Sequence, residues 1–225
     1  MKKLIYAILI CSLVFTSCKA PSLIKSKKYE SLYNEKPLSV LIMPPINRST
    51  NVEAKELFYT TLNVPIINAG YYVIPPFLSM EILKRESAYD SELFIERPSL
   101  EVFGKIFGAD IAMFTIINKW DKSSLASQVV IEIEYILKSI QTNEVLYTKK
   151  GTIVYNTSVD TGGSALLNLA ASLLSTAAIK YVDVARACNN YSFSDIPVGK
   201  YSPNFGLDGE GVSGPKVFKV RLPKR

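Results

Sequence analysis

Residues 129–137 read Val-Val-Ile-Glu-Ile-Glu-Tyr-Ile-Leu, and the alternation in this stretch decides the fold. Successive side chains of a strand point to opposite faces, so the odd-numbered, apolar positions share one face and Glu132 and Glu134 share the other. The pattern predicts a strand with one buried and one wet face, on which the two carboxylates are solvated rather than catalytic. The turn-forming residues 141–144 and the run 145–155 then predict the returning strand of a hairpin.

The chain before this hairpin alternates between strand and helix patterns. Two of its short apolar runs end in Pro-Pro pairs, as buried strands often do, and Gly70 and Gly108 follow helical patterns as C-terminal caps. Strand-helix alternation predicts an α/β fold with a largely parallel arrangement, which the hairpin extends into a mixed sheet. The expected strands cover residues 38–43, 71–74 and 111–117, and the expected helices cover residues 51–70, 77–87 and 98–107.

A long apolar helix is expected after the hairpin, from Ser164 to about residue 187. Residues 165–179 carry no charge, but this stretch is shorter than the roughly 20 apolar residues that cross a bilayer. We therefore expect a buried core helix. The small residues on its other side, Ser172 and Thr176 among them, would also allow a second copy to approach in a two-fold dimer, and this alternative stays open.

The beginning of the chain has the features of a secretion signal. Lys2 and Lys3 precede an apolar run over residues 4–14, and the run leads to Ser17 and Cys18. Residues 14–18, Val-Phe-Thr-Ser-Cys, resemble the lipobox of bacterial lipoproteins. This resemblance implies that the signal peptide 1–17 is cleaved between Ser17 and Cys18, and that Cys18 carries the acyl chains that bind the protein to membrane lipid.

The resemblance also implies a location. Lys19 stands where an aspartate would favour the inner membrane, so we expect an outer-membrane lipoprotein that faces the periplasm. Residues 18–36 are polar and rich in Lys and Ser, which predicts a lipidated flexible tether. We expect an α/β domain over residues 37–187 and an irregular C-terminal extension over residues 188–225. The excess of basic side chains at both ends predicts solvated tails near the membrane rather than a nucleic-acid interface.

Residue types argue against an enzyme. The chain has no histidine, which excludes Ser-His-Asp and Cys-His catalysis and the usual zinc sites. Of three cysteines, Cys11 lies in the signal peptide and Cys18 is expected to be acylated, so Cys188 is left without a partner for a disulfide. We expect no catalytic residues, no metal and no cofactor.

Short motifs occur at residues 41–45, 70–75, 106–110, 142–147 and 196–203. Together they resemble a family of bacterial lipoproteins of unknown function that includes a meningococcal genome-derived antigen. The similar region covers residues 37–203, and the chain departs from the family pattern at Asn143 and Tyr147, where the family tends to have Gly and Trp. Asn143 can still adopt the left-handed turn conformation. The motif residues we single out are Gly70, Tyr71, Tyr72, Pro75, Gly108 and Asp110, together with the segments 41–45, 142–147 and 196–203.

The resemblance implies an α/β fold similar to the amino-terminal domain of the Tol translocation protein. It also implies kinship with the curli-secretion lipoprotein and with lipoprotein activators of peptidoglycan synthases, and it suggests other envelope lipoproteins as partners. We therefore expect a non-enzymatic adaptor or accessory component of an envelope or secretion assembly. The alternative is a subunit of a curli-type oligomeric secretion channel, although Lys149, Lys150 and Gly151 interrupt the second strand of the hairpin.

Overall fold

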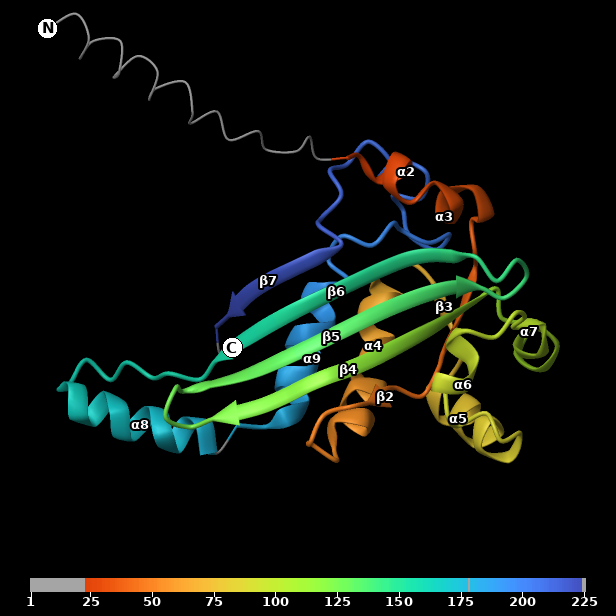
Figure 1. Ribbon diagram of the computed structural model, residues 1–225. Helices are drawn as coiled ribbons and strands as arrows, with labels where there is room; N and C mark the ends of the chain where they lie inside the picture. Colours follow the sequence, from red (N-terminus) through yellow and green to blue (C-terminus); the bar gives the residue numbers. More distant parts are fainter. Residues whose placement is uncertain (1–22, 178, 224–225) are drawn as a thin grey trace, which may run out of the picture.

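The computed structural model describes residues 23–177 and 179–223. Its centre is a mixed sheet of seven strands in the order β3-β1-β4-β5-β6-β7, with β2 also paired to β4 (Figure 1). The strands β3, β1 and β4 run parallel, β4, β5 and β6 run antiparallel, and β7 lies parallel to β6. The expected α/β fold with a mixed sheet is confirmed. The strands are β1 Ser39–Ile42, β2 Ile46–Asn47, β3 Tyr72–Val73, β4 Ile111–Ser123, β5 Gln128–Ser139, β6 Val145–Asn156 and β7 Val217–Leu222.

The strand-helix alternation of the first half and the hairpin are both present. In β5, every second side chain from Val129 to Leu137 is buried, whereas Glu132 and Glu134 are half-buried on the other face, as predicted. Asn143 has a φ of 62° in the turn of the hairpin, which confirms its left-handed conformation. The helices are α2 Lys25–Lys28, α3 Glu30–Glu35, α4 Ala54–Asn68, α5 Pro76–Arg85, α6 Glu92–Ile95, α7 Glu101–Phe107, α8 Ala165–Ala177 and α9 Tyr181–Ser192.

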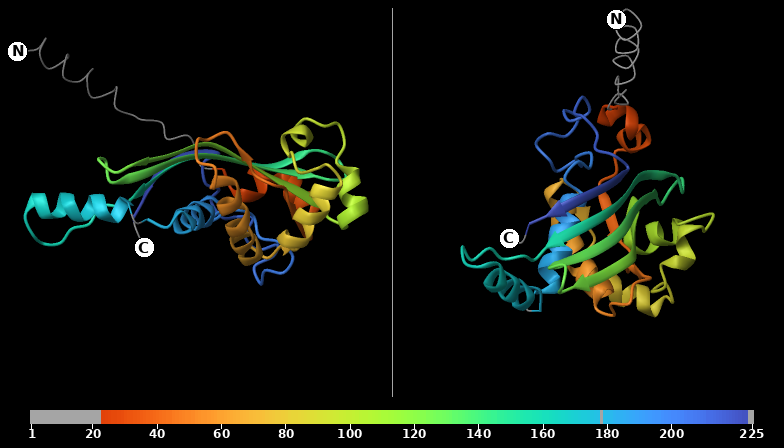
Figure 2. Two further views of the ribbon diagram at one scale, coloured as in Figure 1. Left: turned by 90° about the horizontal axis from the view of Figure 1, so that it is seen from below. Right: turned by 60° about the vertical axis from the view of Figure 1, so that its left-hand side comes forward.

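One face of the sheet packs against α4 and α9, which lie side by side (Figure 2). A buried amide joins these layers: Asn189 of α9 accepts a hydrogen bond from the Tyr135 hydroxyl of β5 at 2.6 Å and donates one to Thr61 Oγ1 of α4 at 2.8 Å. Buried polar groups are costly unless they are paired, so these bonds fix both helices relative to the sheet.

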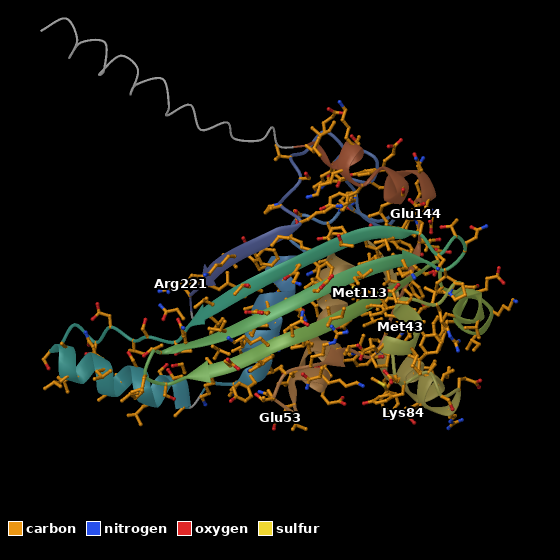
Figure 3. All side chains as sticks on the ribbon, in the orientation of Figure 1. Met43, Glu53, Lys84, Met113, Glu144 and Arg221 are labelled. Atoms are coloured by element: carbon orange, nitrogen blue, oxygen red, sulfur yellow. The ribbon has the colours of Figure 1, made fainter. Side chains whose placement is uncertain are left out.

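The other face of the sheet is covered over only part of its width. Leu41, Met43 and Phe114 contribute to a separate apolar cluster with residues of α5, α6 and α7, among them Phe94 and Phe103. Figure 3 labels Met43, which directly follows β1, and Met113 on the neighbouring strand β4. Met113 belongs to the cluster beneath α4 and α9 instead. Successive sheet residues therefore supply two cores, as the period of a strand requires.

The prediction of one long buried helix is wrong. The chain forms two helices, α8 and α9, that are bent by 86° relative to each other. The position against the sheet is taken by α9, whose Val184, Ala185 and Cys188 are fully buried and whose outer face carries charge. An amphipathic helix suits a surface layer better than an apolar one, so α8 lies beyond the end of the sheet (Figure 1). Among the described residues, no single helix is long and apolar enough to cross a bilayer, and only the bent pair meets that test by length and composition.

The two ends of the described chain are also more ordered than expected. Residues 23–36, expected to belong to a flexible tether, contain α2 and α3, and Tyr29 and Leu32 are buried in the main core. The spacing of Tyr29, Leu32 and Tyr33 is helical, a signal that the abundance of Lys and Ser obscured. The region 188–225, expected to be irregular, contains the end of α9 and the strand β7.

The Asn189 bridge generates a stability prediction. Replacing Asn189 with Ala should lower the free energy of unfolding by about 2–4 kcal/mol, because it leaves the Tyr135 hydroxyl buried without its acceptor and opens a small cavity. The matched control is Asn190→Ala, since Asn190 is exposed on the same helix and should change stability by no more than about 0.5 kcal/mol. Equal effects of the two substitutions in urea denaturation would contradict the structural role of the bridge.

Candidate functional site

Asp110 joins the starts of two parallel strands. One carboxylate oxygen accepts hydrogen bonds from the backbone N–H groups of Leu38 and Ser39 at 2.7 and 2.9 Å, and from Ser39 Oγ at 3.1 Å. The Asp110 N–H in turn donates to Ser39 Oγ at 3.0 Å. The motif residue thus links the segment before β1 to the segment before β4, a role that is structural.

Gly70 and Tyr71 bind the distant segment 196–203, which belongs to the same set of family motifs. The N–H of Gly199 donates to Ala69 O, and the N–H of Tyr201 donates to Gly70 O. Gly70 has a φ of 91°, as its helix-ending position predicts, and a Cβ there would lie 2.5 Å from Ser202 N. The buried Tyr71 hydroxyl donates to Pro197 O at 2.8 Å.

The other motif residues end or begin elements nearby. Gly108 closes α7 in the left-handed conformation, with a φ of 62°. Pro75 precedes α5, and its carbonyl accepts a hydrogen bond from the first turn of that helix, at Ser79 N. Tyr72 lies on β3, and about half of its side chain is exposed. Gly70, Tyr71, Gly108 and Asp110 therefore lie at the amino-terminal end of the parallel strands, whereas Pro75 follows β3 at its carboxyl end. The contacts described for these residues are structural.

A cleft of about 460 Å³ opens beside these motifs, at the amino-terminal ends of β1 and β4. Its lining combines residues from α3, α7, the β5–β6 turn and the segment 196–203. Three carboxylates and three ammonium groups surround a small apolar floor that includes Pro37 and Ile140. The charged residues of the lining are Glu35, Glu101, Asp110, Lys36, Lys105 and Lys200.

One carboxyl group of this cleft, Glu35, has an environment that raises its pKa. Burial raises the pKa of Glu35, and the neighbouring charges of Asp110 and Glu144 raise it further, while a hydrogen bond from Ser139 lowers it. Within the described residues, no three acidic or cysteine side chains are grouped closely enough to hold a metal ion. Sequence reasoning identified Asp110 but missed Glu35, Lys36 and Lys200, because it assigned the first two to the tether and had no pattern that placed the third beside them.

Cys188 is fully buried in α9, and burial raises the pKa of its thiol. A buried thiol in apolar surroundings is a poor nucleophile. Cys188 is therefore a small core residue, in agreement with the sequence interpretation.

The helix α8 forms an arm with the segment 157–163 that precedes it. Asn168, Ser172 and Thr176 are four residues apart and so share one stripe of the helix. The Asn168 side chain accepts a hydrogen bond from Thr161 N, Ser172 Oγ accepts one from Val159 N, and Thr176 bonds to Thr157. The polar stripe, which could also have allowed a second copy to approach, is thus occupied within the chain.

The opposite side of α8 is apolar and open to solvent. Leu166, Leu167, Leu169 and Leu174 are 79%, 61%, 48% and 72% exposed, respectively. The expected burial of this helix in the core is therefore wrong for α8. Residues 165–177 carry no charged side chain that could explain its exposure.

The signal peptide 1–17 and the predicted cleavage and lipidation site at Ser17 and Cys18 lie outside the described residues. The first described residue is Leu23, five positions after Cys18.

Comparison with known proteins identifies the family. Residues 27–197 match the family described as "Putative lipoprotein GNA1162-like". The chain belongs to this family. Membership makes it a membrane-anchored protein of the cell envelope, as the sequence resemblance implied. A relative in Neisseria meningitidis serogroup B, "Putative lipoprotein NMB1124/NMB1162", is 30% identical over 127 residues, which are 55% of this chain and 56% of the relative. The chain thus spans just over half the length of that relative.

Solved structures resemble the fold at low identity. The lipoprotein GNA1162 from Neisseria meningitidis matches with a TM-score of 0.47 and 21% identity, over 61% of this chain and 94% of that one. A PelC dodecamer structure from Paraburkholderia phytofirmans matches with a TM-score of 0.43 and 12% identity, over 71% and 88%. The LpoB C-terminal domain from Escherichia coli matches with a TM-score of 0.38 and 14% identity, over 57% and 94%.

The close approach at Gly70 generates a second stability prediction. Gly70→Ala should lower the free energy of unfolding by at least about 3 kcal/mol, because the new Cβ meets the backbone of Ser202 in addition to the strain of a positive φ. Gly108→Ala is the matched control: its φ is also positive, but a Cβ there has open space, so the strain of about 1–2 kcal/mol acts alone. Thermal unfolding of both variants measures the difference in stability. Equal losses of stability would show that the close approach of residue 70 to Ser202 does not stabilise the fold.

Proposed function

We propose that this protein is a non-enzymatic adaptor, anchored by lipid in the outer membrane, which uses α8 to dock another envelope protein in the periplasm. The observation that carries the proposal is the exposed leucine face of α8. Contiguous apolar surface on a folded protein marks an interaction site. The helix stays in place because its polar stripe is bonded to residues 157–161, which leaves the leucine face free.

The spacing of the apolar residues fits insertion into a groove. Leu166, Leu169 and Ala177 are exposed and Leu173 is half-buried. These four residues are separated by three or four positions, the arrangement with which an amphipathic helix enters an apolar groove. The partner should therefore present an apolar groove with few charges in its floor, since α8 offers no charged side chain to pair with.

A second copy of α8 is a poorer occupant. The helix has 13 residues, and its length is about 20 Å at 1.5 Å per residue. One such helix against its own copy buries much less than the roughly 800 Å² per partner of a stable interface. We therefore favour a groove on a different protein over the two-fold dimer.

The hairpin geometry favours the adaptor over the curli-type channel. Both strands of the hairpin are internal, since β5 is paired with β4 and β6 is paired with β7. Lys149 points to Asp195 and forms a buried ion pair, and Gly151 leaves room for the ring of Phe218. The residues that interrupt the strand pattern therefore fix the hairpin in the sheet, and a channel would require this packing to be broken.

The lipid anchor at Cys18 has a direct test. Cys18→Ala should abolish incorporation of labelled palmitate in cells and leave the signal peptide uncleaved, because the acyl acceptor is missing. Cys11→Ala is the matched control and should incorporate palmitate normally. Labelling of the Cys18→Ala chain would contradict the anchor.

The docking role of α8 can be tested by photo-crosslinking of the full-length lipoprotein in cells. A photoreactive side chain at Leu169 or Leu174 should give a defined adduct that disappears when Leu166→Glu is added. Leu125 provides the control position, since it is exposed in the turn between β4 and β5 and should give no such adduct. Urea denaturation of Leu166→Glu should show little loss of stability.

The adduct mass decides the occupant. An adduct to a different envelope protein supports the proposal, while an adduct of twice the chain mass favours the two-fold dimer. Equal crosslinking at Leu125 and Leu169 would show that α8 has no docking role.

A further inference from the structure

The two basic ends of the chain, which the sequence places far apart, lie together in the fold. Residues 24 and 212 form an antiparallel bridge, Lys25 N donates to Gly211 O, and Ser213 N donates to Leu23 O. The Lys28 ammonium reaches Gly214 O. The result is one surface, at the top of Figure 1, built from α2 and the segment that leads into β7.

A hollow of about 280 Å³ lies in this surface, between α2 and the start of β6. Lys27, Lys28 and Lys216 line it, together with one carboxylate, Glu30. The ion pairs of this region join Lys25 to Asp208 and Lys149 to Asp195, so they use none of the three lysines of the hollow. The hollow therefore has a net positive charge.

The electrostatic environment of Lys28 reflects this excess. Burial lowers the pKa of Lys28, the charges of Lys149 and Lys216 lower it further, and Asp195 opposes the shift. The Gly214 carbonyl that Lys28 contacts is a dipole and leaves the charge unbalanced. An anion in the hollow would supply the missing countercharge.

The basic surface continues along β7, where Lys219 and Arg221 are exposed. Figure 3 shows Arg221 on this strand. Charges on an edge strand also prevent two sheets from pairing, which explains these two residues by itself. That explanation does not extend to Lys27 and Lys28, because α2 is outside the sheet. The hollow and the strand are best explained together by an extended anionic partner.

The position of the proposed lipid anchor identifies this partner. Lys27 is nine residues after Cys18, so the chain between them spans at most about 30 Å. We propose that the hollow formed by Lys27, Lys28 and Lys216 binds the phosphate headgroups of anionic phospholipids in the membrane that holds the anchor. The inference rests on the proposed anchor at Cys18, and it makes α2 and the edge of β7 the membrane-facing side of the domain.

Lysine reactivity in the full, lipidated protein tests this proposal. The protein is placed in nanodiscs of phosphatidylcholine, with or without phosphatidylglycerol, and acetylation by a water-soluble reagent is followed for each lysine by mass spectrometry. Phosphatidylglycerol should lower the acetylation rates of Lys27, Lys28 and Lys216 by about fivefold or more. A change of this size is the effect of one ionic contact at an anionic surface. Concentrated salt should reverse the protection, because it screens charges over a few ångströms.

Lys55, Lys84 and Lys180 serve as control lysines, and Figure 3 shows Lys84 on α5, away from β7. A triple variant, Lys27→Gln, Lys28→Gln and Lys216→Gln, should remove the protection of Lys219. The matched triple variant at the three control lysines should retain it, although its net charge is the same.

The other outcomes either contradict the headgroup site or separate it from the lipid anchor. Equal rates in both kinds of disc, or equal slowing at the control lysines, would show that the hollow does not bind headgroups. Protection by inorganic phosphate alone in phosphatidylcholine discs would make it a site for free phosphate instead. If the chain carries no palmitate, flotation with phosphatidylglycerol vesicles but not with phosphatidylcholine vesicles would keep the headgroup site and remove the anchor. Flotation with neither kind of vesicle would contradict both the headgroup site and the lipid anchor.

Discussion

The arrangement of the domain depends on one buried side chain, Asn189. Its amide contacts the sheet through Tyr135 and the neighbouring helix through Thr61, so three elements from distant parts of the sequence share one polar bridge. A polar group at this depth is stable only when both ends of the amide are bonded, which sets the position of α9. Because α4 and α9 cover this face of the sheet, α8 has no room on it and lies beyond the end of the sheet. The exposed leucine face of α8 follows from this placement.

The sequence predicted the elements whose patterns are local. The alternation in β5, the left-handed turn at Asn143 and the glycine at position 70 all follow from rules that act over a few residues. The break between α8 and α9 and the order at both ends were not predictable in this way. Lys28 meets Gly214 across 186 positions of sequence, and no local pattern describes such a contact. The choice of buried helix also depends on tertiary packing, since the less apolar helix, α9, packs against the sheet and α8 does not.

The lining of the candidate cleft was also predictable only where local motifs mark its residues. Asp110 and Gly70 could be identified because family motifs contain them, and their bonds explain why those residue types are required. Glu35, Lys36 and Lys200 line the cleft only because α3 packs onto the domain and the segment 196–203 binds Gly70. The cleft has equal numbers of acidic and basic groups, and their positions depend on contacts between segments that are distant in the sequence.

The bridge between residues 24 and 212 has a mechanical consequence. With the lipid anchor that we propose at Cys18, the protein would be held at one point, and drag on the domain would pull on Leu23 and the residues that follow it. Here that load passes from Leu23 and Lys25 to Ser213 and Gly211, and then into β7, which is bonded along its length to β6. The force is thus distributed over the sheet instead of unwinding α2 and α3 from their end. The C-terminal segment thus supports the amino-terminal helices. In a chain that ends before β7, a pulling force should unfold α2 and α3 first.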